Sequence, residues 1–368
     1  MTASLLLAAA LLPAPTPPPA SAQDLDAVQV RALGLRRTDP FLLPATTSVV
    51  DVHALSAHSP VDLAGAFDGI AGVAARDRQN RAQDLQLSIR GYGARSTFGV
   101  RGIRVLADGL PASAPDGQGQ LSQFNLLATE RIEVVRGPFS ALHGNASGGV
   151  VQLSSSPGQE GDPWWLQVQA GSGGEASLAA RLKGRAGAVG YNIVPMHWRA
   201  DGYRQHSAAQ RSGLNVRLDW QAGQHTTATV LAQHFNAPDA QDPRGLTASE
   251  WRADPRLAAP VARTFNTRKS VRQDQLGTVI EHDRGTMSLR LSAQAGQRAV
   301  TQYLAIPAAA QANRLHGGGV IALDSDYAGV DLRLGGNPHP ALEWSIGLNS
   351  EGQRQWRRGF ENFIGSTL

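Results

Sequence analysis

The stretch RIEVVRGPFSALHGNASGGVVQL, residues Arg131 to Leu153, decides the fold that the sequence predicts. It begins with β-branched residues alternating with charged ones, as in a strand with one buried face. Gly137 and Pro138 stop this strand, and Pro138 suits the first position of a short helix because its missing N–H is not needed there. The glycines of GNASGG then permit positive φ or a close approach to another surface before a second strand, Val150–Leu153. By spacing alone, an ordinary α+β core element explains the stretch equally well.

The N-terminus has the pattern of an export signal. Leu5–Leu12 is a short apolar run, and the small residues Ala20–Ala22 precede Gln23 as in a cleavage site. The run is too short to span a membrane, and no Lys or Arg precedes it, which departs from the usual signal pattern. We therefore expect a signal peptide over residues 1–22.

Composition limits the classes of protein that fit the chain. The 34 Lys and Arg against 30 Asp and Glu give a net charge of only +4, and the charges are scattered, which argues against a nucleic-acid surface. The lack of cysteine excludes a disulfide framework and thiol chemistry. With 40 glycines, 21 prolines and 6% aromatic residues, we expect many short strands and turns.

Residues 23–47 carry no regular period and are expected to be extended. Within them, Val28–Val30 alternates and can add to the edge of another protein's sheet, while a plain linker explains the segment as well. No more specific prediction follows from spacing in this segment.

A small α+β domain is expected next. Ser59–Phe67 predicts a helix, because Ser59 can cap it and Pro60 suits its first position. Leu85–Arg90 alternates apolar and polar residues, and Val105–Ala107 precedes an Asp-Gly turn, so both segments predict strands. These strands and the opening stretch together predict a small sheet.

Beyond residue 162 the sequence changes to long alternating runs. Short turns separate some of them, whereas residues 236–267 and 305–319 are long and irregular. In an exported chain, short and long connections between amphipathic strands match a transmembrane β-barrel. A soluble β-sandwich also alternates, but the second face here is charged, as expected for a wet lumen rather than a dry core. The clearest runs are Leu178–Leu182, Leu214–Trp220, Met287–Gln294, Val330–Leu334 and Trp344–Leu348.

Four motifs resemble the plug of TonB-dependent outer-membrane receptors, in the family's order and spacing. In that family, an N-terminal plug fills a large barrel, binds a scarce nutrient with its outward loops and is rearranged when the inner-membrane TonB protein pulls on a short N-terminal box. The resemblance covers roughly residues 45 to 155 and implies a plug domain over residues 48–157 and a barrel over residues 163–368. The motifs are SIRGYGARS (88–96), GVRGIRVLADGLP (99–111), PDGQGQ (115–120) and the stretch quoted first.

The resemblance also implies roles for single residues. In the periplasmic extension 23–47, the TonB-box candidate is DAVQVRA at Asp26–Ala32, which strand addition would read. Arg90 and Arg136 resemble plug arginines that pair with glutamates on the barrel wall. A buried ion pair of this kind fixes the register of the plug more than it stabilises the fold. The alternative is that both arginine side chains are exposed to solvent on the small sheet. The box candidates are Asp26, Ala27, Val28, Gln29 and Val30, and the ligand-contact candidates, chosen by loop position only, are Arg95, Ser96, Arg101, Gln118, Gln120 and Gln123.

One departure from the family concerns the barrel. A plugged barrel of this kind has about 22 strands, whereas residues 163–368 offer room for about nine. The chain also ends in Gly365–Leu368 without the terminal aromatic residue of the family's last strand. We therefore expect a truncated fragment, an α+β plug followed by part of an antiparallel transmembrane β-barrel, with the barrel-wall glutamates lying beyond residue 368.

The function that the resemblance implies is TonB-dependent uptake of a scarce nutrient across the outer membrane of a Gram-negative-type envelope. An iron chelate, a siderophore or ferric citrate, is the cargo expected first, and cobalamin or carbohydrate stays open. Copper fits less well with only 3 Met, since cuprous sites favour Met and Cys. The expected partners are TonB, the nutrient chelate and outer-membrane lipid, with no nucleic acid, no cofactor and no resident metal.

Two other classes of protein compete with this interpretation. A passive porin or structural barrel would need neither a plug nor a segment on which TonB pulls. For an exported enzyme, Gly91–Gly93 lacks the third glycine of a dinucleotide loop, and His53 and His58 lack the i, i+4 spacing of a metal pair. No GxSxG elbow and no nucleophile with its base is visible either, so catalysis is not expected.

Overall fold

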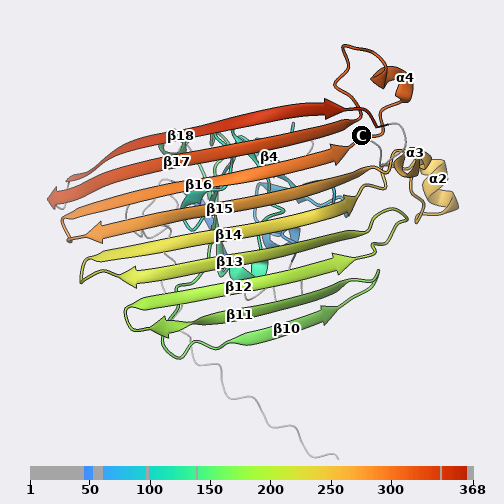
Figure 1. Cartoon of the computed structure of the whole chain (residues 1–368). Helices are drawn as coiled ribbons and strands as arrows, with labels where there is room; N and C mark the ends of the chain where they lie inside the picture. Colours follow the sequence, from blue (N-terminus) through green and yellow to red (C-terminus); the bar gives the residue numbers. More distant parts are fainter. Residues whose placement is uncertain (1–44, 53–60, 97–98, 138–139, 340–341, 363–368) are drawn as a thin grey trace, which may run out of the picture.

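The computed structural model describes residues 45–52, 61–96, 99–137, 140–339 and 342–362. These residues form a small α+β domain and a nine-stranded antiparallel sheet, and the domain lies against one face of the sheet (Figure 1). We call the domain the plug and the sheet the wall. The predictions for the signal peptide and for the TonB box at Asp26–Val30 lie outside the described residues.

The plug is built on a five-stranded sheet in the order β1-β8-β9-β5-β6, with two small ribbons, β2-β3 and β4-β7. β5 and β9 pair in parallel, and the other neighbours in the five-stranded sheet are antiparallel. The plug elements are β1 (Thr46–Asp51), η3 (Ala64–Phe67), β2 (Val73–Arg76), β3 (Gln86–Ile89), β4 (Val100–Arg101), β5 (Arg104–Ala107), β6 (Leu110–Pro111), β7 (Gln118–Gly119), η4 (Leu126–Ala128), β8 (Arg131–Arg136), α1 (Ser140–His143) and β9 (Val150–Ser154).

The stretch quoted first forms the centre of this sheet, as predicted: β8, the short helix α1 and β9 follow one another, and Val134 pairs with Val151. Ile132, Val134 and Val151 are fully buried in the plug core, and burying such a side chain stabilises by roughly 1.5–3 kcal/mol. Gly149, with φ of 131°, is required where the chain enters β9, because a Cβ there would overlap the Val135 carbonyl oxygen.

The strands predicted at Leu85–Arg90 and Val105–Ala107 are confirmed as β3 and β5. Asp108 and Gly109 link β5 to β6 with φ of 49° and 81°, the left-handed pair of a tight hairpin turn. The Asp-Gly signal therefore marks the turn correctly, and it fixes the position of the Asp108 side chain at the end of the hairpin.

The helix predicted over Ser59–Phe67 is wrong in its described part, where only the 3-10 helix η3 forms. The Asp62 carboxylate accepts a hydrogen bond from the Ala64 N–H at 3.2 Å, whereas the N-cap residue of η3, Leu63, makes no side-chain cap hydrogen bond. Ala66 and Phe67 are buried, and Phe67 packs in the plug core. Packing of this short segment therefore takes precedence over the local helix signal.

In the wall, every strand pairs with its neighbour in sequence, from β10 to β18. The prediction of about nine long amphipathic strands is confirmed in the described residues, and all five alternating runs lie within strands. The wall strands are β10 (Trp165–Ala170), β11 (Ala176–Ala186), β12 (Val189–Ala200), β13 (Ala209–Gln221), β14 (Thr226–Gln241), β15 (Arg268–Asp283), β16 (Met287–Tyr303), β17 (Val320–His339) and β18 (Leu342–Phe360).

Long and short connections alternate along the wall, as predicted. The turns after β11, β13 and β15 are short, residues 187–188, 222–225 and 284–286, and lie at one end of the strands. The longer connections after β14 and β16 lie at the opposite end, where Figure 1 shows α2, α3 and α4. We call the two ends of the wall the turn end and the loop end.

The long segment 236–267 is more ordered than expected. β14 continues to Gln241, and the loop that follows contains α2 (Ala248–Ala253) and α3 (Pro260–Thr264). Thr247 caps α2 in a reciprocal capping box with Glu250, a signal that the sequence carries as T-x-x-E. The other long segment contains the short helix α4 (Ala308–Gln311). Among the described residues, no helix has both the length and the apolar character needed to cross a membrane.

Candidate functional site

The candidate site is the boundary between the plug and the wall, where charged side chains of the wall point toward plug loops. Among the residues that the structure describes, three ion pairs cross this boundary, each from a different wall strand. Asp84 pairs with Lys269 of β15 at 2.7 Å, and Asp108 pairs with Arg217 of β13 at 2.9 Å. The third pair joins Arg104 of β5 to Glu351 of β18. These charges can fix the register of the plug against the wall, beside an apolar cluster in which Val61 and Ala82 of the plug pack with wall residues that include Trp198.

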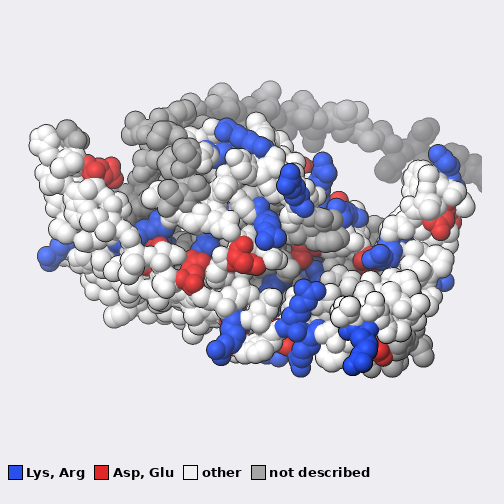
Figure 2. All heavy atoms as spheres, turned by 90° about the horizontal axis from the view of Figure 1, so that it is seen from above, with Lys and Arg blue, Asp and Glu red and all other residues white. Residues whose placement is uncertain are grey.

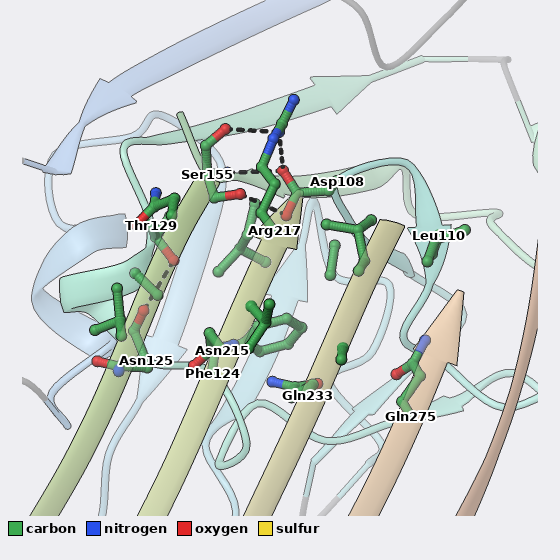
Figure 3. A pocket seen from close by; sticks show the side chains of 18 residues that line it. Asp108, Leu110, Phe124, Asn125, Thr129, Ser155, Asn215, Arg217, Gln233 and Gln275 are labelled. Carbon is green, nitrogen blue, oxygen red and sulfur yellow. Dashed lines mark hydrogen bonds and ion pairs between the residues drawn. The ribbon is translucent and has the colours of Figure 1, made fainter. Parts of the chain in front are cut away.

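Arg217 makes the densest of these contacts (Figure 3). Its Nη1 donates to the Asp108 carboxylate and to the Ser155 carbonyl oxygen, each at 2.9 Å. Its Nε and Nη2 donate to both oxygens of Asp219 on the same strand, each at 2.8 Å. Asp108 in turn accepts from the Ser155 N–H and hydroxyl, each at 2.8 Å. One arginine thus ties the β5-β6 turn and the end of the plug to β13.

A cavity of about 70 Å³ lies beside this network, between the plug and β12 to β15. Phe124 and Leu153 of the plug face Val194 and Leu231 of the wall across it. Polar side chains at its edge include Asn125, Asn192, Asn215, Gln233 and Gln275. Because one water needs about 10–15 Å³ of such volume, the cavity has room for several waters.

Asp84 lies at the other side of the boundary, toward the loop end. Burial raises the pKa of Asp84, but the charges of Lys269 and Arg298 and the hydrogen bond from Lys269 outweigh this effect, so that its pKa is lowered. Nearby, Asn80 and Gln83 donate to the Asp242 carboxylate at 2.7 and 3.4 Å. The segment Asp77–Asp84 therefore binds the plug to β14 and β15 at the loop end of the wall.

Sequence reasoning missed this segment. The sequence from residue 77 to 84, DRQNRAQD, contains one apolar residue among alternating acidic, basic and amide side chains. Such a composition predicts only a solvated loop, because it does not indicate that Asp84 pairs with Lys269 of a wall strand. The alternating charges of residues 77–84 were the only sequence signal for this contact. They can be interpreted only when β15, which carries Lys269, is known to lie beside them.

The ligand-contact candidates fall into two groups in the structure. Arg95, Arg101 and Gln118 are exposed on plug loops and ribbons, and Arg101 pairs in register with Gln118 between β4 and β7. Gln123 is instead buried, and its carbonyl oxygen accepts from the Gln233 amide of β14 at 3.0 Å. The two remaining candidates, Ser96 and Gln120, are half-buried. The structure therefore brings together Arg101 and Gln118, and it places Gln123 at the boundary with the wall.

Arg90 and Arg136 lie close to each other on the plug. Arg136 is buried and donates to the Ala71 carbonyl oxygen and to the Ser48 hydroxyl. Arg90 is exposed and donates to the Thr46 hydroxyl at 3.3 Å. Burial and the nearby Arg90 charge lower the pKa of Arg136. In the described part of the chain, neither guanidinium forms an ion pair, so their pairing with barrel glutamates stays a prediction.

Other kinds of site find little support in the described residues. They contain no group of three or more His, Asp or Glu side chains placed to hold a metal ion. Figure 2 shows Lys and Arg spread over one face of the molecule with Asp and Glu between them. Such mixing of charges differs from the basic stripe of a nucleic-acid surface.

Residues 40–150 match the family model described as the TonB-dependent Receptor Plug Domain. This part of the chain resembles the plug domain of TonB-dependent receptors. The fold of the chain is similar to that of the solved ferric citrate transporter FecA, with a TM-score of 0.68 and 18% identity over 87% of this chain and 50% of that one. The ferric yersiniabactin uptake receptor FyuA from Yersinia pestis gives a TM-score of 0.66 and 14% identity over 84% of this chain and 49% of that one.

Two curated relatives of this chain carry the name vitamin B12 transporter. BtuB of Vibrio vulnificus is 28% identical over 193 residues, which cover 51% of this chain and 30% of the relative. BtuB of Photobacterium profundum is 26% identical over 210 residues, which cover 49% of this chain and 34% of the relative. The chain thus aligns with about a third of the curated relatives and about half of the solved receptors.

Proposed function

We propose that this chain forms the plug and part of the barrel of an outer-membrane receptor that takes up a scarce nutrient with energy delivered by TonB. The observation that carries the proposal is the plug-domain match over residues 40–150, on a domain that lies against a sheet of nine amphipathic strands. An iron chelate, a siderophore or ferric citrate, is the proposed cargo. The names of the solved neighbours, ferric citrate and ferric yersiniabactin receptors, support this choice.

The plug boundary fits such a role. Polar and ionic contacts between the plug and the wall can be exchanged for water at modest net cost, since buried ion pairs contribute little net stability. The apolar core of the plug is separate from these contacts and can persist while they break. A pull on the N-terminal extension could therefore displace or rearrange the plug without first unfolding its centre.

The residue roles belong to the same proposal. Asp26–Val30 is proposed as the box that TonB binds by strand addition, and Arg101 and Gln118 as part of the surface that meets the cargo. Arg90 and Arg136 are proposed to pair with carboxylates of the barrel wall, because two neighbouring guanidiniums without an ion pair in the described residues need compensating negative charge.

Cobalamin is the second candidate cargo, because both curated relatives carry the name vitamin B12 transporter. The two cargoes can be separated with radiolabelled ferric citrate and radiolabelled cyanocobalamin. The measurement uses cells that lack the gene encoding this chain and the same cells with the gene restored.

Uptake that requires both the gene and the proton gradient, and that stops when residues 26–30 are replaced by glycine, supports the proposal. Uptake that continues after the gradient is dissipated would identify a passive porin instead. If restoring the gene changes the uptake of neither compound under iron or cobalamin limitation, both cargo assignments fail.

A further inference from the structure

Asp242, the first residue after β14, contacts the plug and its own loop with one side chain. It is 6% exposed, and its carboxylate accepts two hydrogen bonds from the plug. Asn80 donates to Oδ1 at 2.7 Å, and Gln83 donates to Oδ2 at 3.4 Å. The Arg244 N–H donates to the same Oδ1 at 2.8 Å. Because a buried carboxylate depends on such donors, the contacts to the plug and to the loop share one compensated charge.

The hydrogen bond from Arg244 shapes the start of the loop between β14 and β15. It closes a turn in which an Asp side chain binds the backbone two residues further on. Arg244 has φ of 60°, in the left-handed region that residues other than glycine seldom adopt. The turn helps to hold this conformation, so the position of the Asp242 carboxylate determines where the carbonyl groups of Pro243 and Arg244 point.

Both of these carbonyl oxygens bind Arg204, which lies in the connection between β12 and β13. Arg204 Nη1 donates to the Arg244 oxygen at 2.6 Å, and Nη2 donates to the Pro243 oxygen at 3.3 Å. Nε and Nη2 also donate to the Leu257 oxygen, at 2.9 and 2.8 Å, later in the same loop. One guanidinium therefore joins the two connections, and two of its three acceptors directly follow Asp242.

The backbone of Asp242 is fixed separately, at the base of the loop. Its N–H donates to the Thr267 carbonyl oxygen at 2.8 Å, and the hydroxyl of Thr267 donates to the Asp242 carbonyl oxygen at 2.6 Å. Thr267 is 1% exposed, and His206 Nε2 lies 2.9 Å from its carbonyl oxygen. With its backbone held in this way, Asp242 meets the plug through its side chain alone.

We propose that Asp242 couples the seating of the plug to the arrangement of the connections that follow β12 and β14. When Asn80 and Gln83 leave, the carboxylate loses donors that compensate its burial, and its turn with Arg244 loosens. The carbonyl groups that Arg204 binds then lose their fixed direction. Coupling of this kind is reciprocal, so a ligand that rearranges the two connections acts on the plug through the same residue. The proposal holds for any cargo and does not rest on the transport function.

The test is hydrogen–deuterium exchange of the full chain in detergent with the plug variant Asn80→Asp. This change keeps the side-chain oxygen that accepts a backbone N–H within the plug, but it replaces the donor to Asp242 with a second negative charge. The reporter is the amide of Gln205, which donates to the Arg256 carbonyl oxygen at 2.7 Å across the two connections. We expect this amide to exchange about tenfold faster, the effect of losing one hydrogen bond to a charged group.

Two further variants make the test specific. The double variant Asn80→Asp with Asp242→Asn exchanges the amide and the carboxylate, so it should restore most of the protection of Gln205. Asn145→Asp is the matched control, because it adds the same charge to the plug at a contact within the plug, where Asn145 donates to the Asp116 carbonyl oxygen. This control should leave the exchange of Gln205 unchanged.

The reverse direction supplies a second measurement if Asn80→Asp does not fold. Arg204→Gln should make the amides of residues 79–83 exchange severalfold faster, because the coupling is reciprocal. Unchanged exchange of residues 79–83 in this variant would overturn the proposal. So would unchanged exchange of Gln205 in Asn80→Asp, an equal change in Asn145→Asp, or no recovery in the double variant. Uptake is not measured, so failure here leaves the transport function to its own test.

Discussion

The plug and the wall are both built from alternating strands, but they place their apolar residues in opposite locations. In the plug, Ile132, Val134 and Val151 point inward and are fully buried. In the wall, Val168 and Leu348 point away from the plug and are 73% and 70% exposed. The side chains that the wall turns toward the plug include many charged and amide groups, together with buried apolar ones such as Met196 and Trp198. The comparison teaches that the plug carries its own core and meets the wall through polar and ionic contacts beside a smaller shared apolar cluster.

The first prediction places one substitution in each region. Val151→Asp buries an unpaired carboxylate in the plug core and should cost about 4 kcal/mol or more. Val168→Asp introduces the same group on the outer face of β10, where we expect a cost below about 2 kcal/mol because Asp is tolerated better there than a basic residue. Limited proteolysis of the two variants measures the difference. Equal protease sensitivity of the plug in both would contradict the separation of cores.

The second prediction concerns the Asp84–Lys269 pair. Lys269→Met leaves the Asp84 carboxylate buried without its main partner and should destabilise seating of the plug by about 3–5 kcal/mol. The double variant Asp84→Leu with Lys269→Met should recover most of this loss, because it removes both charges. The measurement is the urea concentration at which the plug separates from the wall, detected by protease cleavage within residues 77–84. A double variant as unstable as the single one would show that packing, not charge, determines the contact.

The same pair has a defined pH dependence. Because the folded pKa of Asp84 is lowered, its contribution is fully present above the ordinary carboxyl pKa of about 3.9. The contribution decreases as the pH falls toward and through the lower folded value. Plug seating should therefore stay constant from neutral pH to about 5 and weaken only in stronger acid. In Lys269→Met this weakening should begin at higher pH, which urea release at several pH values measures.

The smallest effect is expected far from the boundary. Thr247→Ala removes the reciprocal cap of α2, where Thr247 accepts from the Glu250 N–H. The loss of such a cap costs about 1 kcal/mol, and it should loosen α2 without changing the contacts of Asp242 with the plug. Hydrogen exchange of residues 247–253 measures it. A change in exchange of β8 would show that α2 is coupled to the plug.

The sequence predicted the parts of the fold that depend on local chemistry. The opening stretch carries its strand, glycine and proline signals within one short segment, and the Asp108–Gly109 turn needs only two residues to specify it. The alternating runs of the wall are visible because each strand alternates by itself. The helix over Ser59–Phe67 failed because burial of Phe67 against distant residues determines that segment.

The candidate site could be predicted only in part. Gln123 has the sequence environment of a loop residue, yet it is buried against β14. The partners Asp84 and Lys269 are 185 positions apart, and no local pattern joins them. Asp242 directly follows a long strand, and its contact with Asn80, 162 positions away, becomes visible only when the plug lies against it. Contacts between distant segments therefore need the structure.

Hydrogen–deuterium exchange of the full chain with Arg217→Gln tests the separation of plug core and plug boundary most directly. The substitution removes the donor that joins Asp108 and Ser155 to β13. Removing one partner of a buried pair costs about 3 kcal/mol, which corresponds to about a hundredfold in an opening equilibrium. We predict that residues 108–112 and 155–157 exchange at least tenfold faster, while the amides of β8 around Val134 keep their protection. An equal increase in β8, or no increase at the boundary, would contradict the account.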